Sequence, residues 1–160
     1  MDIQIFTTGG TIDKVYFDAR SNFEVGEPQI VEILREANVT VAYRVETLFR
    51  KDSLDLTDAD RAVIAERVRK TPCRRVLITH GTDTMIQTAQ ALQALPEKII
   101  VLVGSLSPAR FKRSDAEFNI GFALGAVQAL PAGVYIAMNG CIFDPEKVRK
   151  NREMNQFEVV

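Results

Sequence analysis

Short runs rich in isoleucine and valine alternate along this chain with segments of helical period. Five of these runs are too short for helices, and most are bounded by glycine, proline or polar turns; they lie near residues 2–7, 39–48, 74–79, 98–103 and 133–138. Strands that alternate with helices usually pair in parallel and are covered on both faces. The sequence therefore predicts a three-layer α/β fold: a doubly wound, mostly parallel sheet with helices on both faces.

Polar residues mark the starts of helices and the position of one hairpin. Thr57 with Asp60, and Ser114 with Glu117, have the spacing of a capping box, and apolar helical segments follow both pairs. Asn139-Gly140 predicts a tight C-terminal hairpin, because both central residues of a type I′ turn need positive φ.

The segment 12–27 has little periodicity, apart from a small hairpin around "VYFDARSNFEV". Loops of this length are often lids or binding loops, and disorder or an additional hairpin explains them equally well. Whether this loop is ordered stays open at this point.

Composition fits one self-sufficient domain, assigned to residues 1–160. Its 46% hydrophobic and 26% charged residues are ordinary for a globular protein. The net charge is −1, and no aromatic residues interleave the short basic groups, so neither nucleic acid nor an anionic membrane is an expected partner. No charged leader precedes the first strand and no apolar stretch could span a bilayer, so we expect a cytoplasmic protein.

The residues present exclude several common catalytic sites. His80 is the one histidine, and the two cysteines, Cys73 and Cys141, form no C-x-x-C pair, so a zinc site is not expected. The chain has no P-loop, no G-x-G-x-x-G fingerprint and no G-x-S-x-G elbow. We therefore expect neither a metal nor an organic cofactor, and we interpret His80 as a structural hydrogen-bonding residue rather than a triad member.

Three loops rich in glycine and hydroxyl side chains follow predicted strands: "TTGGT" (7–11), "THGTDT" (79–84) and "VGSLSP" (103–108). Ligands of open parallel sheets bind beyond the carboxyl ends of the strands, where such loops can converge. Glycine N–H groups can hold an oxyanion, and a threonine hydroxyl can attack a carbonyl when a neighbour takes its proton. Taken singly, each loop is better explained as a turn, and Thr82 or Asp83 as a helix cap. Together the loops favour a site.

These residues resemble the L-asparaginase family of threonine amidohydrolases. "TTGGTI" resembles the first signature of the family and "ITHGTDT" the second, while "RSDAEFN" and "VYIAMNG" resemble further family segments. The similarity runs in order along nearly the whole chain. It covers only what would be the N-terminal domain of the common form, which is roughly twice as long, although short single-domain members also exist.

The resemblance implies a role for each matching residue. Thr11 would be the nucleophile that attacks the side-chain amide of the substrate. Tyr16 would activate it, although Phe23 lies nearer one common alignment of that tyrosine. Thr82 would be the second catalytic threonine, and Asp83 would bind the α-ammonium group of the substrate.

Four further positions would bind the substrate: Gly10, Asp52, Ser53 and Gly81. Of these, Asp52 and Ser53 resemble the loop that grips the α-carboxylate. Many family members also carry a lysine near the second threonine, and the best-matched position here is Leu130. Either another lysine, such as Lys112, reaches the site, or the threonine is activated differently. We assign no lysine a catalytic role from the sequence.

The resemblance implies hydrolysis of L-asparagine to L-aspartate and ammonia through an acyl-enzyme intermediate, in a homo-oligomer (a dimer or tetramer). A preference for glutamine stays open, because one methylene is worth only about 1–3 kcal/mol in a pocket. Leu130 and the absent second domain motivate a third alternative, a binding module that keeps the amino-acid pocket and has lost catalysis. How the site closes without that domain is also left open.

Overall fold

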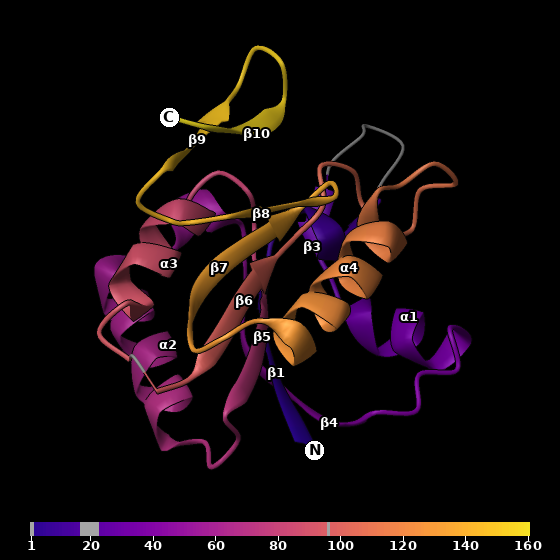
Figure 1. The fold of residues 1–160 in the computed structure, drawn as a ribbon. Coiled ribbons are helices and arrows are strands. Elements are labelled where there is room, and N and C mark those ends of the chain that lie inside the picture. Colours follow the sequence, from indigo (N-terminus) through magenta and orange to yellow (C-terminus); the bar gives the residue numbers. More distant parts are fainter. Residues whose placement is uncertain (1, 17–22, 96) are drawn as a thin grey trace.

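A six-stranded sheet forms the centre of the molecule (Figure 1). The computed structural model describes residues 2–16, 23–95 and 97–160. The strand order is β4-β1-β5-β6-β7-β8, and neighbouring strands pair in parallel except β7 with β8. The strands are β1 (Asp2–Gly9), β4 (Ala42–Lys51), β5 (Arg75–Thr79), β6 (Ile99–Val103), β7 (Gly133–Met138) and β8 (Cys141–Phe143). The predicted mostly parallel sheet is confirmed.

Helices cover both faces of this sheet, as Figure 1 shows. α2 and α3 lie on one face, and α1 and α4 lie on the other. Ile5 of β1 packs on the α1 and α4 side and Phe6 on the α2 and α3 side, so the strand is buried on both faces, its polar residue Gln4 included. The helices are α1 (Ile30–Glu36), α2 (Asp58–Lys70), α3 (Met85–Leu92) and α4 (Ala116–Ala129). None of them, within the described ranges, is long and apolar enough to cross a membrane.

Two antiparallel pairs stand apart from the main sheet: β2 (Lys14–Tyr16) with β3 (Phe23–Val25), and β9 (Val148–Asn151) with β10 (Gln156–Val159). The first is the small hairpin expected within 12–27, although residues 17–22 lie outside the described residues. The second is a C-terminal hairpin. Between them in sequence, Asn139 and Gly140 have φ angles of 49° and 84° and join β7 to β8 by the predicted turn.

The carboxyl ends of β1, β5 and β6 lie side by side. Thr7 of β1 pairs with Thr79 of β5, and Thr79 pairs with Val103 of β6. The loops that follow these strands therefore leave the sheet at one edge. Two short 3-10 turns lie at the same edge: η1 (Thr11–Asp13) follows β1, and η2 (Ser53–Asp55) follows β4.

The two predicted capping boxes have different outcomes. The box at the start of α2 is confirmed, because Thr57 accepts from the Asp60 N–H and the Asp60 side chain accepts from the Thr57 N–H. The prediction of a capping box at the start of α4 is wrong. Its N-cap residue is Asp115, whose carboxylate accepts instead from the N–H groups of Leu106 and Ser107, at 3.0 and 3.1 Å. The start of α4 is thereby tied to the loop after β6.

Candidate active site

Two glycines bring the loops after β1 and β5 into direct contact. Gly10 has a φ of 91°, and a Cβ atom placed on it would lie 2.4 Å from both the Cα and the N atoms of Gly81. No side chain fits in that space, and L-residues rarely adopt this φ. Thr11 and Thr82 follow these glycines directly, so their backbones are held on neighbouring segments.

Ser53 packs against the same contact from the turn after β4. A Cβ atom on Gly81 would lie 2.6 Å from the Ser53 Cβ atom and 2.7 Å from its Oγ atom. Ser53 is buried, and its backbone oxygen accepts a hydrogen bond of 2.7 Å from Thr84 Oγ1. The structure therefore brings together predicted site residues from three neighbouring strands, β4, β1 and β5.

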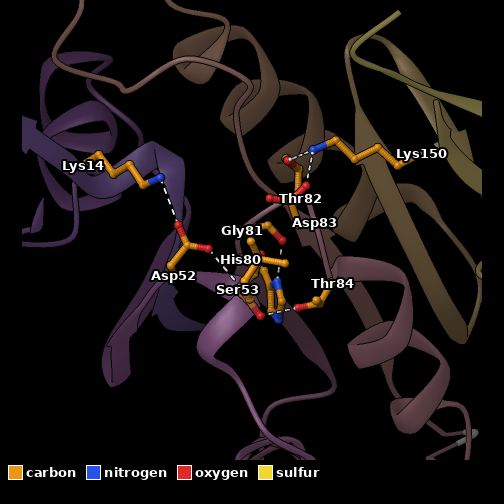
Figure 2. Close-up of polar contacts among 10 residues, drawn as sticks. Lys14, Asp52, Ser53, His80, Gly81, Thr82, Asp83, Thr84 and Lys150 are labelled. Atoms are coloured by element: carbon orange, nitrogen blue, oxygen red, sulfur yellow. Dashed lines mark hydrogen bonds and ion pairs between the residues drawn. The ribbon is translucent and has the colours of Figure 1, made fainter. Parts of the chain in front are cut away.

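Thr82 and Asp83 share a lysine partner that the sequence had not indicated. Lys150 Nζ lies 2.8 Å from Thr82 Oγ1 and 2.8 Å from Asp83 Oδ1, as Figure 2 shows. The Lys150 side chain is only 13% exposed, so its ion pair with Asp83 is partly shielded from solvent and salt. Because Lys150 belongs to β9, the C-terminal hairpin supplies a cation to the loop after β5.

Neither Leu130 nor Lys112 supplies this cation. Leu130 caps the end of α4 and packs against the apolar layer on that side of the sheet, and Lys112 is exposed in the loop before α4. In β9, Val148 is buried, Arg149 is exposed and Lys150 is half-buried, which is the alternation of a strand with one covered face. This burial is visible only in the structure, so Lys150 could not be identified from the sequence.

His80 holds the backbone of the second loop. Its Nδ1 lies 2.7 Å from the Gly81 carbonyl oxygen, and its Nε2 lies 2.8 Å from Thr88 Oγ1 in α3. A carbonyl oxygen only accepts, so Nδ1 carries the proton and Nε2 accepts from the Thr88 hydroxyl. Burial lowers the His80 pKa to about 4, so the ring is neutral near pH 7. The structural interpretation of His80 is confirmed.

Asp52 lies on the opposite side of Gly81 from Lys150 and faces Lys14 (Figure 2). Lys14 Nζ is 3.0 Å from Asp52 Oδ2, and the Leu54 N–H donates to Asp52 Oδ1 at 3.0 Å. Burial raises the pKa of the Asp52 carboxyl, but the Leu54 N–H and the Lys14 ammonium outweigh it, and the pKa lies below its ordinary value. Asp52 is therefore a carboxylate at neutral pH.

Tyr16, the predicted activating partner of Thr11, is the last residue of β2. Its backbone pairs across the hairpin with that of Phe23, the alternative position. The side chains of both residues lie outside the described part of the structure. The role of Tyr16 therefore stays a prediction.

A hydrogen-bond network fixes the third predicted loop, "VGSLSP". Asn119 Nδ2 donates to the Gly104 carbonyl oxygen at 3.0 Å and to Asp115 Oδ2 at 2.9 Å. Asn139 Nδ2 donates to the same carboxylate oxygen at 3.0 Å. The segments "RSDAEFN" and "VYIAMNG" thus meet beside the loop after β6, and they hold it at the carboxyl edge of the sheet.

Among the described residues, this edge gathers hydroxyls, glycine backbone and two carboxylate–ammonium pairs, Asp52 with Lys14 and Asp83 with Lys150. Such a set can bind a zwitterion through its charges and polarise a carbonyl through its N–H groups. In the described part of the chain, no cluster of three or more His, Cys, Asp or Glu side chains is placed to hold a metal ion.

Fold and site together define a doubly wound α/β protein that presents paired threonine and glycine loops at the carboxyl edge of its sheet. A family model described as "Asparaginase, N-terminal" matches residues 2–158. The chain therefore belongs to the asparaginase family.

Individual relatives agree with this assignment. The chain is 29% identical to L-asparaginase 2 of Escherichia coli (strain K12), over 93% of this chain and 46% of that protein. It is also 29% identical to the glutaminase-asparaginase of Acinetobacter glutaminasificans, over 93% of this chain and 49% of the relative. The structure of the thermostable L-asparaginase from Thermococcus kodakarensis matches with a TM-score of 0.86 at 26% identity, over 100% of this chain and 51% of that one. The chain spans about half the length of these proteins.

Proposed function

We propose that this chain is an amidohydrolase that converts L-asparagine to L-aspartate and ammonia. The observation that carries the proposal is the contact between Gly10 and Gly81, which holds the loops of Thr11 and Thr82 together. Membership of the asparaginase family supports the reaction type. Relatives named L-asparaginase 2 and glutaminase-asparaginase support an amino-acid amide as the substrate.

Thr11 is the proposed nucleophile. Its oxygen attacks the side-chain carbonyl carbon of the substrate while a general base takes its proton, and Tyr16 is the proposed base. The C–N bond then breaks and ammonia leaves with the proton, so that an ester links the aspartyl group to Thr11. Water hydrolyses this ester and restores the hydroxyl. General-base help of this kind accelerates a reaction by about 10²–10⁴.

Thr82 is the proposed second catalytic threonine. The Lys150 ammonium lies 2.8 Å from its oxygen, so the hydroxyl proton points away from Lys150 and negative charge on the oxygen is stabilised. A hydroxyl oriented in this way can pass a proton between the leaving group, the substrate and water. Asp83 keeps Lys150 in place through an ion pair of 2.8 Å.

The two ends of the substrate find groups of opposite charge in this arrangement. We assign the α-ammonium group to Asp83, whose ionised carboxylate has about four acceptor sites, of which Lys150 uses one. The α-carboxylate is assigned to the turn that contains Asp52 and Ser53. The backbones of Gly10 and Gly81 are assigned to the centre of the site, where a Cβ atom on either glycine would clash with the facing loop.

Replacing Lys150 by methionine is expected to lower kcat about a hundredfold, because Thr82 loses the cation that polarises its oxygen. Lys147→Met is the matched control. Lys147 is exposed on the same C-terminal segment and pairs with Asp144 at 3.7 Å, so this variant should keep the wild-type kcat. Ammonia release measures both variants, and equal rates for the two would remove Lys150 from the mechanism.

Ammonia release from L-asparagine and from L-glutamine by the purified chain tests the proposed function. We expect release from L-asparagine, and the ratio of the two kcat/KM values gives the preference between the amides. If neither amide releases ammonia, the proposed function is wrong.

One observation favours a second candidate, a binding module without catalysis. Leu130 stands where many family members carry a lysine, and it packs against the apolar layer beside α4. Without that lysine the charged groups of the site can still bind an amino acid, while the activation of Thr82 depends on Lys150 alone. Calorimetry that detects L-aspartate binding in a chain with no turnover would favour this candidate.

A further inference from the structure

Lys14 lies beside the candidate site and has no part in the mechanism above. It is the first residue of β2 and follows Thr11 by three positions, on the segment that leaves the end of β1. Its ammonium is 3.0 Å from Asp52 Oδ2, and the two side chains are 26% and 32% exposed. In Figure 2 the ammonium points inward, toward Asp52 and the loop of Ser53 and Gly81.

Asp52 alone does not suit the binding of a substrate carboxylate, and Lys14 supplies the positive charge that this turn needs. The turn of Asp52 and Ser53 is the proposed grip for a carboxylate, yet Asp52 is itself a carboxylate and repels one. Its Oδ1 accepts from the Leu54 N–H and its Oδ2 faces Lys14, so both oxygens are engaged by groups of the chain. Asp52 therefore serves to hold Lys14 in place. The ammonium has three N–H donors, which leaves donors for a second carboxylate.

Two ion pairs thus flank Gly81, the glycine that contacts Gly10. Lys14 with Asp52 lies on one side, and Lys150 with Asp83 lies on the other (Figure 2). A free amino acid carries one charge of each sign at its α-carbon. Asp83 offers a negative charge to its ammonium, and Lys14 offers a positive charge to its carboxylate.

We propose that Lys14 is a specificity-determining residue whose ammonium, positioned by Asp52, binds the α-carboxylate of the substrate. The inference rests on the proposed function and names the group that selects a free amino-acid amide over an amide within a peptide. Amides inside a peptide chain, or those with a blocked α-carboxyl group, lack the charge that Lys14 binds. Charge-assisted hydrogen bonds of this kind change affinity by about tenfold or more.

Calorimetry with L-aspartate and with its α-amide tests the inference. The two ligands differ only at the α-carboxyl group, and neither has a side-chain amide to hydrolyse. We expect wild-type protein to bind L-aspartate at least about tenfold more tightly than the α-amide. Lys14→Met should remove this preference by weakening L-aspartate alone, and Lys14→Arg should retain it.

Lys70→Met is the matched control, because Lys70 pairs with Glu66 at 3.1 Å on α2, outside the site. It should keep the wild-type preference. The inference is overturned if wild-type protein shows no preference or binds neither ligand, or if the preference survives in Lys14→Met. Ammonia release separates the two proposals: a chain that prefers L-aspartate but releases no ammonia contradicts only the proposed reaction, and one that releases ammonia without the preference contradicts only the role of Lys14.

Discussion

Replacing Thr11 by alanine is expected to reduce ammonia release from L-asparagine by at least about a thousandfold, because no ester can form without the hydroxyl. The fold should survive the change. The turn that carries Thr11 is closed by a backbone hydrogen bond of 3.1 Å from the Asp13 N–H to the Gly10 carbonyl oxygen, which does not involve the threonine side chain. Steady-state ammonia release measures the loss, and circular dichroism checks the fold.

Thr11→Ser is the matched control for this variant. Serine keeps a nucleophilic hydroxyl at the same position, so most of the ammonia release should remain. Activity retained in Thr11→Ala would contradict the proposed role, and the same assay on Thr82→Ala would then decide whether the second threonine is the nucleophile.

The fold could be predicted from the sequence because its main determinants are local and periodic. The strands β1, β5 and β6 are buried on both faces, so each contains a run of apolar residues that is too short for a helix. The turn at Asn139-Gly140 and the capping box at Thr57 are fixed by residues within four positions of each other. Signals of this kind depend on backbone geometry that a few residues dictate.

The box predicted at Ser114 failed because a tertiary contact competed with the local one. Asp115, the next residue, directs its carboxylate to the loop after β6 and to Asn119 and Asn139. A carboxylate with several donors from neighbouring loops gains more than one local capping bond provides. Spacing alone does not reveal such partners.

The loops of the candidate site could be predicted from the sequence, but the lysine that contacts Thr82 and Asp83 could not. Glycine and threonine at strand ends indicate where a backbone approaches a ligand, and the contact of Gly10 with Gly81 agrees with that pattern. Lys150 reaches Asp83 from 67 positions away, on a strand of four residues. Nothing local distinguishes it from an exposed lysine, since the partner is brought near only by the packing of the C-terminal hairpin.

Asp13→Asn is expected to stabilise the protein at pH 8 by up to about 4 kcal/mol and to have little effect below pH 4. The Asp13 side chain is 2% exposed, and burial raises its pKa to about 7, although the Gln29 N–H, Arg110 and Arg50 act in the opposite direction. In the unfolded chain this carboxyl ionises near pH 3.8. The folded state therefore holds a proton that the unfolded state has lost, and stability falls as the pH rises between these two values.

The Asp13→Asn variant removes the titrating carboxyl group and keeps the hydrogen-bond acceptor. Its side-chain oxygen can still accept from the Gln29 N–H, which is 2.8 Å from Asp13 Oδ1, but it carries no proton to lose. Urea unfolding at pH 4 and pH 8 measures the free energy of unfolding of both proteins, and Asp55→Asn, at an exposed carboxyl on η2, serves as the control. If the difference in free energy of unfolding between Asp13→Asn and wild-type protein is the same at pH 4 and pH 8, the pKa of Asp13 is not raised in the folded protein.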